Sequence, residues 1–268
     1  MLNQLIALVS KNLRQLLRDR ILHAVFGVAL ILLLAVPILS GFSMRQVQEL
    51  AITLSLSTIS LVLLVLALLL GSSSVWRDIE RRYTASILTL PISRSTYIVA
   101  KFITISLFLI LCGVLLFVAS ACVIPLAAKQ YISALPIVWT NIIVAIAADV
   151  LKSMLIAMCA ILLSSVSTSF FLPFFGSLAI FFAGSASQEV YEYLTGQFGQ
   201  HISPITYKLI QFVYFLLPNF AAFDFKVHAV YSLSINIESF LYPLVYALIY
   251  LNLLLILTIS IFNRRELP

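Results

Sequence analysis

Two ionisable side chains stand within a long apolar run, and of all residues in the chain they have the most evident capacity for chemistry. Asp149 and Lys152 lie three residues apart, which places them on one face of a helix. Ionised groups in apolar surroundings are costly unless they pair with one another, so we predict an Asp149–Lys152 ion pair. The pair would either relay a substrate or a proton or simply fix helix packing, and we favour the structural role.

Other residues that often carry chemistry are scattered along the chain. The histidines and cysteines are His23, His201, His228, Cys112, Cys122 and Cys159. Their spacing matches no metal-binding pattern, and each cysteine lies in an apolar run. We therefore expect no metal ion, cofactor or catalytic residue in this chain. An intramembrane enzyme is a weaker alternative, because only Asp149 and Lys152 would offer it chemistry.

The densest charge lies in one segment between two uncharged apolar runs, from Gly71 to Lys101. Its charged residues are Arg77, Asp78, Glu80, Arg81, Arg82, Arg94 and Lys101. The apolar positions of residues 83–90 recur at helical spacing, and Pro91 would end that helix. A new helix would begin within residues 91–94, with Ser95 or Thr96 as its N-cap. A short helix with an apolar face suits docking in a groove of a partner; the alternative is an ordinary solvated loop.

The composition shows what surrounds the rest of the chain. Hydrophobic residues make up 62 % of the 268 residues and charged residues only 10 %, well below the soluble average. So few polar groups cannot cover a soluble domain of this size, so the solvent must be lipid. Long unbroken apolar runs indicate helices rather than a barrel. We predict an all-α polytopic membrane protein, and the net charge of +6 does not indicate nucleic acid.

Six apolar runs approach the ~20 residues that a helix needs to cross a bilayer. They cover about residues 21–40, 50–70, 102–124, 138–163, 170–183 and 241–262. Residues 1–20 form an amphipathic helix at the membrane interface rather than a cleaved signal peptide. Residues 184–240 form one or two helices on the outer face, broken at Pro218-Asn219; a seventh span is the alternative. The whole chain, 1–268, is one domain.

The basic residues orient these spans. With both termini in the cytoplasm, eleven lie inside: Lys11, Arg14, Arg18, Arg20, Arg77, Arg81, Arg82, Arg94, Lys101, Arg264 and Arg265. Four lie outside: Arg45, Lys129, Lys208 and Lys226. This bias follows the positive-inside rule and agrees with an even number of spans. Residues 72–101 would then be a cytoplasmic loop.

The run WRDIERRYTASILTLPISRSTYIVAKF resembles the loop after the second span in permeases of ATP-binding-cassette (ABC) exporters of the second export type. The matching positions are Glu80, Leu88, Leu90, Pro91, Ser93, Arg94, Tyr97, Ala100 and Lys101. Thr84-Ala85 stands where Gly-Thr is usual. The amphipathic first helix, the six spans and the run LLPNFAAFD before the last span extend the resemblance over nearly the whole chain.

The resemblance implies that residues 78–90 are a coupling helix on a nucleotide-binding subunit, with residues 2–20 as a connecting helix beside it. The implied contact residues are Arg77, Asp78, Glu80, Arg81, Arg82, Leu88, Leu90, Pro91 and Arg94. The chain has no G-x-x-x-x-G-K-[S/T] motif, so ATP and Mg²⁺ would be bound by a separate ATPase. ATP binding there would tilt two permease chains and open a path between them.

The expected protein is thus the membrane subunit of an exporter in the bacterial cytoplasmic membrane, paired as a homodimer or heterodimer of permeases. One alternative is a non-transporting membrane scaffold that recruits a cytoplasmic factor through residues 72–101. Another is a permease dedicated to metalloenzyme assembly, because the short outer loops weakly resemble the copper-processing subgroup.

Overall fold

The computed structural model describes residues 2–43, 45–80, 93–129, 133, 135–195 and 203–265, and every regular element among them is helical. The elements in chain order are α1 (Leu2–Leu16), α2 (Arg20–Ser40), α3 (Val47–Glu80), α5 (Arg94–Ala128), α6 (Trp139–Val166), α7 (Phe171–Thr195), α8 (Pro204–Leu216), a 3₁₀ turn η2 (Ala221–Phe223), α9 (Lys226–Val230) and α10 (Ile237–Arg264).

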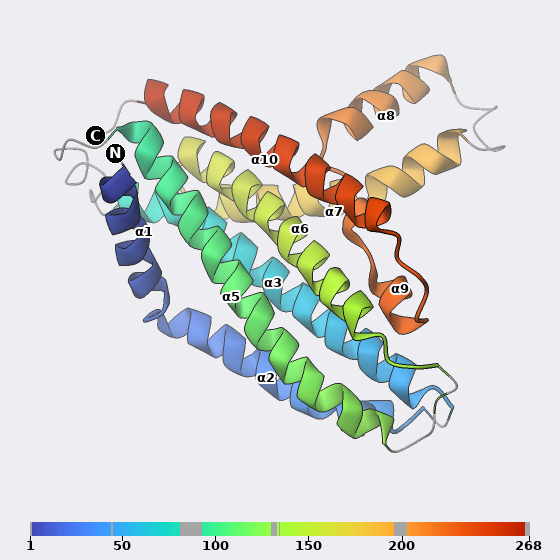
Figure 1. Ribbon diagram of the computed structural model, residues 1–268. Coiled ribbons are helices and arrows are strands. Elements are labelled where there is room, and N and C mark those ends of the chain that lie inside the picture. The colour runs from blue at the N-terminus through green and yellow to red at the C-terminus, as the bar shows by residue number, and fades with distance from the viewer. Residues whose placement is uncertain are drawn as a thin grey trace.

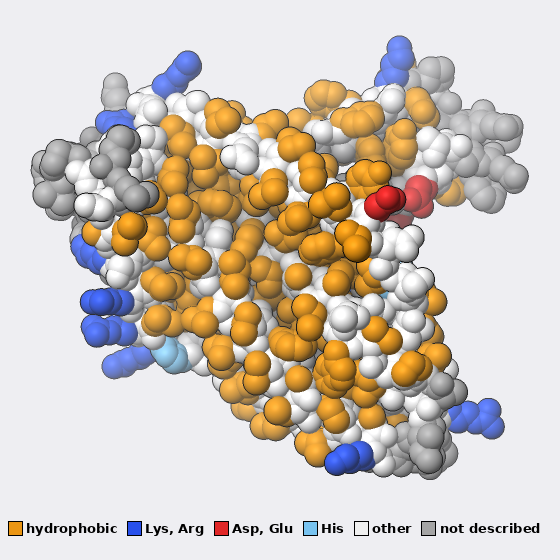
Figure 2. Space-filling view, in the orientation of Figure 1, with side chains coloured by type: hydrophobic (Ala, Val, Ile, Leu, Met, Phe, Trp, Pro, Cys, Tyr) orange, Lys and Arg blue, Asp and Glu red, His pale blue; other side chains and the backbone are white. Residues whose placement is uncertain are grey.

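Six of these helices are long and apolar enough to cross a membrane: α2, α3, α5, α6, α7 and α10. The finding confirms the all-α class and the number of spans. The long helices α2, α3, α5, α6 and α10 run side by side in a tilted bundle, with α1 set at an angle at one end (Figure 1). Hydrophobic side chains cover most of the visible face, and Lys and Arg lie at its margins (Figure 2).

The end of the bundle that holds α1 and the last residues of α10 is called the terminal end below (Figure 1). The last turns of α3 and α6 and the first turns of α5 and α7 also lie there, since residues at these ends contact one another or α10. The opposite end, which holds the α2–α3 and α5–α6 connections, is called the far end.

α6 is the central helix of the bundle. In the most apolar 18-residue stretch of α6, 72 % of the residues are buried, whereas the corresponding fraction in α10 at the periphery is 17 %. α6 approaches α3 closely at Gly71, where an added Cβ would lie 2.5 Å from the Cβ of Ala160 and 2.8 Å from the carbonyl oxygen of Ala157. Small residues allow such close helix packing inside a membrane.

The helix ends differ from the sequence prediction in α3. The second span was predicted to end near residue 70, with residues 72–101 as a loop after it, but α3 continues as a helix to Glu80. The hydroxyls of Ser73 and Ser74 donate to the carbonyls of Leu69 and Gly71, both at 2.7 Å. Their polar groups are therefore satisfied within the helix, and nothing forces the helix to end there.

The predicted third span also lies within a longer helix. The helix that begins after Ser93 and the predicted span are one continuous helix, α5. Pro125 does not close it but lies inside its last turn, where the Lys129 N–H donates to the Pro125 carbonyl at 3.1 Å. A helix in lipid keeps its internal hydrogen bonds wherever it can, because the hydrocarbon offers no other partners.

The described part of residues 184–240 contains the end of α7, the short elements α8, η2 and α9, and the first turn of α10. α7 runs past the predicted end at Ala183 to Thr195, and α8, with 13 residues, is too short to span. The rings of Tyr191 and Tyr214 stack at 4.3 Å, so the end of α7 and α8 pack as a pair. α8 ends at Leu216, just before Pro218-Asn219, as the proline predicts.

Candidate functional site

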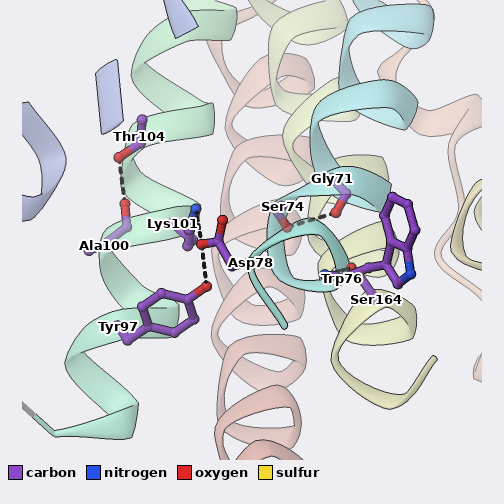
Figure 3. Close-up of polar contacts among 9 residues, drawn as sticks. All are labelled: Gly71, Ser74, Trp76, Asp78, Tyr97, Ala100, Lys101, Thr104 and Ser164. Carbon is purple, nitrogen blue, oxygen red and sulfur yellow. Dashed lines mark hydrogen bonds and ion pairs between the residues drawn. The ribbon is translucent and has the colours of Figure 1, made fainter. Parts of the chain in front are cut away.

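The two helices that flank residues 81–92 meet in a mostly buried polar cluster at the terminal end. Near the end of α3, Oδ2 of Asp78 accepts a hydrogen bond from the Tyr97 hydroxyl at 2.7 Å. The same oxygen lies 2.7 Å from Nζ of Lys101, and the two side chains of this ion pair are only 13–14 % exposed. Tyr97 and Lys101 lie one turn apart on α5, so both reach the carboxylate (Figure 3). Asp78 therefore ties α3 to α5 within the chain.

Trp76 links the same part of α3 to α6 and α7. Its backbone N–H donates to Oγ of Ser164 at 2.9 Å, and that hydroxyl donates to the Ser72 carbonyl at 2.8 Å. The Ser164 hydroxyl thus bridges one turn of α3; Figure 3 shows its contact with the Trp76 backbone. The Trp76 indole N–H donates to the carbonyl of Thr168, between α6 and α7, at 3.0 Å.

Arg94, the first residue of α5, holds the end of α10. One guanidinium nitrogen, Nη1, donates to the carbonyls of Phe262, Asn263 and Arg265 at 3.4, 3.1 and 2.9 Å. Carbonyls in the last turn of a helix lack the usual partners within the helix, and a cation at a helix C-terminus is favourable. Stacking of Tyr97 on Phe262, with ring centroids 5.7 Å apart, joins the same two helices.

The N-cap of α5 is Ser93 rather than Ser95 or Thr96, so the sequence prediction of the cap is wrong. Oγ of Ser93 accepts a hydrogen bond from the Thr96 N–H at 3.2 Å. The Thr96 and Ser95 hydroxyls lie 2.7 and 2.9 Å from the same oxygen. The two hydroxyls support the cap instead of providing it.

Arg265, just past α10, continues the network to α6. Its guanidinium donates to the carbonyl of Ser165 and, at 3.0 Å, to that of Ser167, which follows the last residue of α6. Partial burial lowers the pKa of the Arg265 guanidinium from its ordinary value. The terminal ends of α3, α5, α6 and α10 and the turn between α6 and α7 are therefore joined by side-chain hydrogen bonds.

α1 and α2 are joined to this network more weakly. Arg77 lies 3.7 Å from Asp19, in an ion pair whose side chains are 35 % and 27 % exposed. Solvent weakens such pairs, which typically contribute below about 1 kcal/mol. Glu80 is exposed at the end of α3. The expected contact residues Arg81, Arg82, Leu88, Leu90 and Pro91 lie outside the described residues.

Asp149 and Lys152 form an ion pair inside the bundle. Nζ of Lys152 lies 2.6 Å from Oδ1 of Asp149, and the Asp149 side chain is 2 % exposed. The Ser60 hydroxyl of α3 donates to the same Oδ1 at 3.2 Å. Within the part of the chain that the structure describes, Oδ2 of Asp149 has no hydrogen-bond partner. The cluster lies between α3 and α6, away from the terminal end.

Sequence reasoning missed Ser164 and Arg265 as parts of the terminal network. Two signals pointed to them: the polar turn SSVSTS at the end of α6, and a basic pair directly after the last span, where a helix C-terminus attracts cations. Among the described residues, no three His, Cys, Asp or Glu side chains lie together as a metal site would require.

These observations define a polytopic helical membrane protein. At its terminal end, hydrogen bonds and an ion pair join the helices next to the charged segment, residues 71–101. A comparison with protein families matches residues 6–267 to the model described as ABC-2 family transporter protein. The chain belongs to this family, so it is the membrane permease subunit of an ABC transporter and not the ATPase. A search of curated proteins found no match.

Proposed function

We propose that this permease couples to a separate ABC ATPase through the segment between α3 and α5 and works as an exporter. The observation that carries the proposal is the Asp78–Tyr97–Lys101 cluster. It clamps together the two helices from which the segment emerges, so a force applied to residues 81–92 acts on α3 and α5 at once.

The hydrogen bonds around the cluster spread that force through the bundle. Trp76 passes it to the end of α6 and the start of α7, and Arg94 passes it to α10. The terminal ends of five spans then move together. α1 and α2 join this polar network through the exposed Asp19–Arg77 pair, and they pack on the bundle through apolar side chains such as Leu8, Leu22 and Leu33.

The terminal end faces the cytoplasm in this proposal, because most basic residues of the chain lie in the segments there. ATP and Mg²⁺ bind to the partner ATPase, whose closure pushes the segments of two permease chains together. The two chains form a homodimer or heterodimer, and their relative tilt opens the path. α1 lies in the membrane interface, with its apolar face on the bundle.

The Asp149–Lys152 pair has a structural role in this proposal. It lies in the tight α3–α6 interface, where Ser60 satisfies part of the carboxylate. An ion pair there aligns two helices that must move as a unit, and it neutralises two charges that would otherwise be costly in lipid.

The test is reconstitution with a cassette ATPase that co-purifies with the tagged chain. The two proteins, co-expressed and purified, should form a complex whose ATP hydrolysis in lipid nanodiscs exceeds that of the ATPase alone. Lys101→Met should reduce this stimulation, because it breaks the clamp. The matched control, Lys226→Met, changes a lysine near the far end. Binding of a partner without any effect of ATP would instead support a scaffold.

A further inference from the structure

A wide groove of about 1040 Å³ opens at the terminal end between α1 and the last turns of α3. Arg14 of α1 and Arg18 in the turn after it line one side, and Trp76 and Arg77 line the other. Ile21, near the start of α2, closes one margin. Of these residues, Trp76 also takes part in the hydrogen bonds that join α3 to α6 and to the turn after it.

The amphipathic pattern of α1 places its basic side chains in this groove. Lys11 and Arg14 lie on one face and are exposed, whereas Leu5, Val9 and Leu16 on the opposite face pack against the core. The helical turn continues beyond α1, since the Leu17 N–H donates to the Leu13 carbonyl at 2.9 Å. Arg18 therefore follows Arg14 by about one turn and reaches the same groove.

The charge of the groove favours an anion. Among the described residues that line it, four basic side chains stand against two carboxylates, those of Asp19 and Glu80. One carboxylate, Asp19, lies 3.7 Å from Arg77, so it compensates a residue of α3 rather than Arg14 or Arg18. A group of Lys and Arg side chains is visible along the edge that α1 occupies (Figure 2).

The groove also borders an apolar surface of the kind that meets lipid. Ile21 is 57 % exposed at its margin, and on α1 itself Ile6 and Leu17 are 57 % and 45 % exposed. α2 begins at Arg20, and only 22 % of the residues in its most apolar 18-residue stretch are buried, so most of this span faces outward. Trp76 is a residue typical of the level where lipid headgroups begin. An anion in the groove would thus lie beside acyl chains.

We propose that this groove binds the phosphate headgroup of an anionic phospholipid from the leaflet at the terminal end. The guanidinium groups of Arg14 and Arg18 bind the phosphate, which they suit through paired, charge-assisted hydrogen bonds. The acyl chains run along α2 beyond Ile21. The bound lipid adds to the exposed Asp19–Arg77 pair in holding α1 and the turn after it against the end of α3.

The test measures lipid preference of the purified full chain, with no ATPase present. The chain is placed in nanodiscs of phosphatidylcholine that contain traces of spin-labelled phosphatidylglycerol or spin-labelled phosphatidylcholine. Electron paramagnetic resonance then gives the preference for the anionic label. In the variant Arg14→Gln/Arg18→Gln, the preference for the anionic label should fall about tenfold. Each basic residue near a membrane surface contributes about 1 kcal/mol, partly screened by salt.

Two controls separate the groove from net charge and from misfolding. Arg45→Gln/Lys129→Gln removes two exposed charges at the far end and should keep the preference. Arg14→Lys/Arg18→Lys keeps the charge and should retain most of it. Equal loss in the far-end control, or an unchanged preference in Arg14→Gln/Arg18→Gln, would overturn the proposal. So would displacement of the label by millimolar inorganic phosphate, which would indicate a site for free anions. Failure here leaves ATPase coupling untouched.

Discussion

Nζ of Lys101 on α5 lies 2.7 Å from Oδ2 of Asp78 on α3, and this ion pair joins the two helices that flank residues 81–92. The pair is mostly buried and lies against the Tyr97 ring, whose centroid is 5.7 Å from Nζ. Because Asp78 and Lys101 join α3 to α5, a force on the segment between these helices should move both of them together.

Breaking the clamp should destabilise the protein in steps. Asp78→Asn leaves Lys101 mostly buried without its counter-ion and should cost about 3 kcal/mol of unfolding free energy. Tyr97→Phe removes one hydrogen bond and keeps the ion pair, so we expect a loss of about 1 kcal/mol. Thermal unfolding in detergent, followed by tryptophan fluorescence, gives the order of the two. Equal, negligible shifts would show that the cluster contributes nothing to stability.

The close α3–α6 contact at Gly71 should not tolerate a side chain. In Gly71→Ala the new Cβ would lie 2.5 Å from that of Ala160, so one helix must shift, at a cost of about 1–3 kcal/mol. Gly27→Ala in α2 is the matched control, because nothing lies within 4 Å of its Cβ position. We expect that control to be neutral or more stable, by up to about 1 kcal/mol from helix propensity. The two melting temperatures should shift in opposite directions or differ clearly.

Asp149 and Lys152 allow a double-mutant cycle that separates their two possible roles. Asp149→Asn and Lys152→Met should each destabilise the protein by a few kcal/mol, because each leaves the other group buried and poorly paired. Asp149→Asn/Lys152→Met should recover most of that loss and keep the stimulation of ATP hydrolysis. A stable double variant without stimulation would instead assign the pair to a relay.

Arg94 should hold the last turn of α10. Arg94→Ala removes the donor for three backbone carbonyls, so amide hydrogen exchange in residues 260–265 should become about tenfold faster, equivalent to a loss of about 1.4 kcal/mol. Arg264→Ala, an exposed neighbour, is the control and should leave exchange unchanged. Equal protection in both variants would mean that the α10 end is held by other contacts.

The sequence was sufficient to predict the helical class, the six spans and the break before Pro218, because long apolar runs and prolines are local signals. Helix ends were harder to predict. The polar residues 72–74 suggested the end of a helix, yet the hydroxyls of Ser73 and Ser74 bond within α3, and Gly71 lets α6 approach. Arg94 illustrates the other limit: it was expected to contact a partner, and its carbonyl acceptors lie near the other end of the chain sequence.

The measurement that tests coupling most directly is the ATP hydrolysis stimulated by this chain when Glu80, exposed at the end of α3, is reversed to lysine. In the reconstituted complex with Glu80→Lys, the stimulation of ATP hydrolysis should fall about tenfold, because the reversal places an unfavourable charge at the interface. Glu238→Lys, an exposed reversal at the start of α10, should keep it. Full stimulation by Glu80→Lys in an intact complex would contradict the proposal that this segment receives the force of the ATPase.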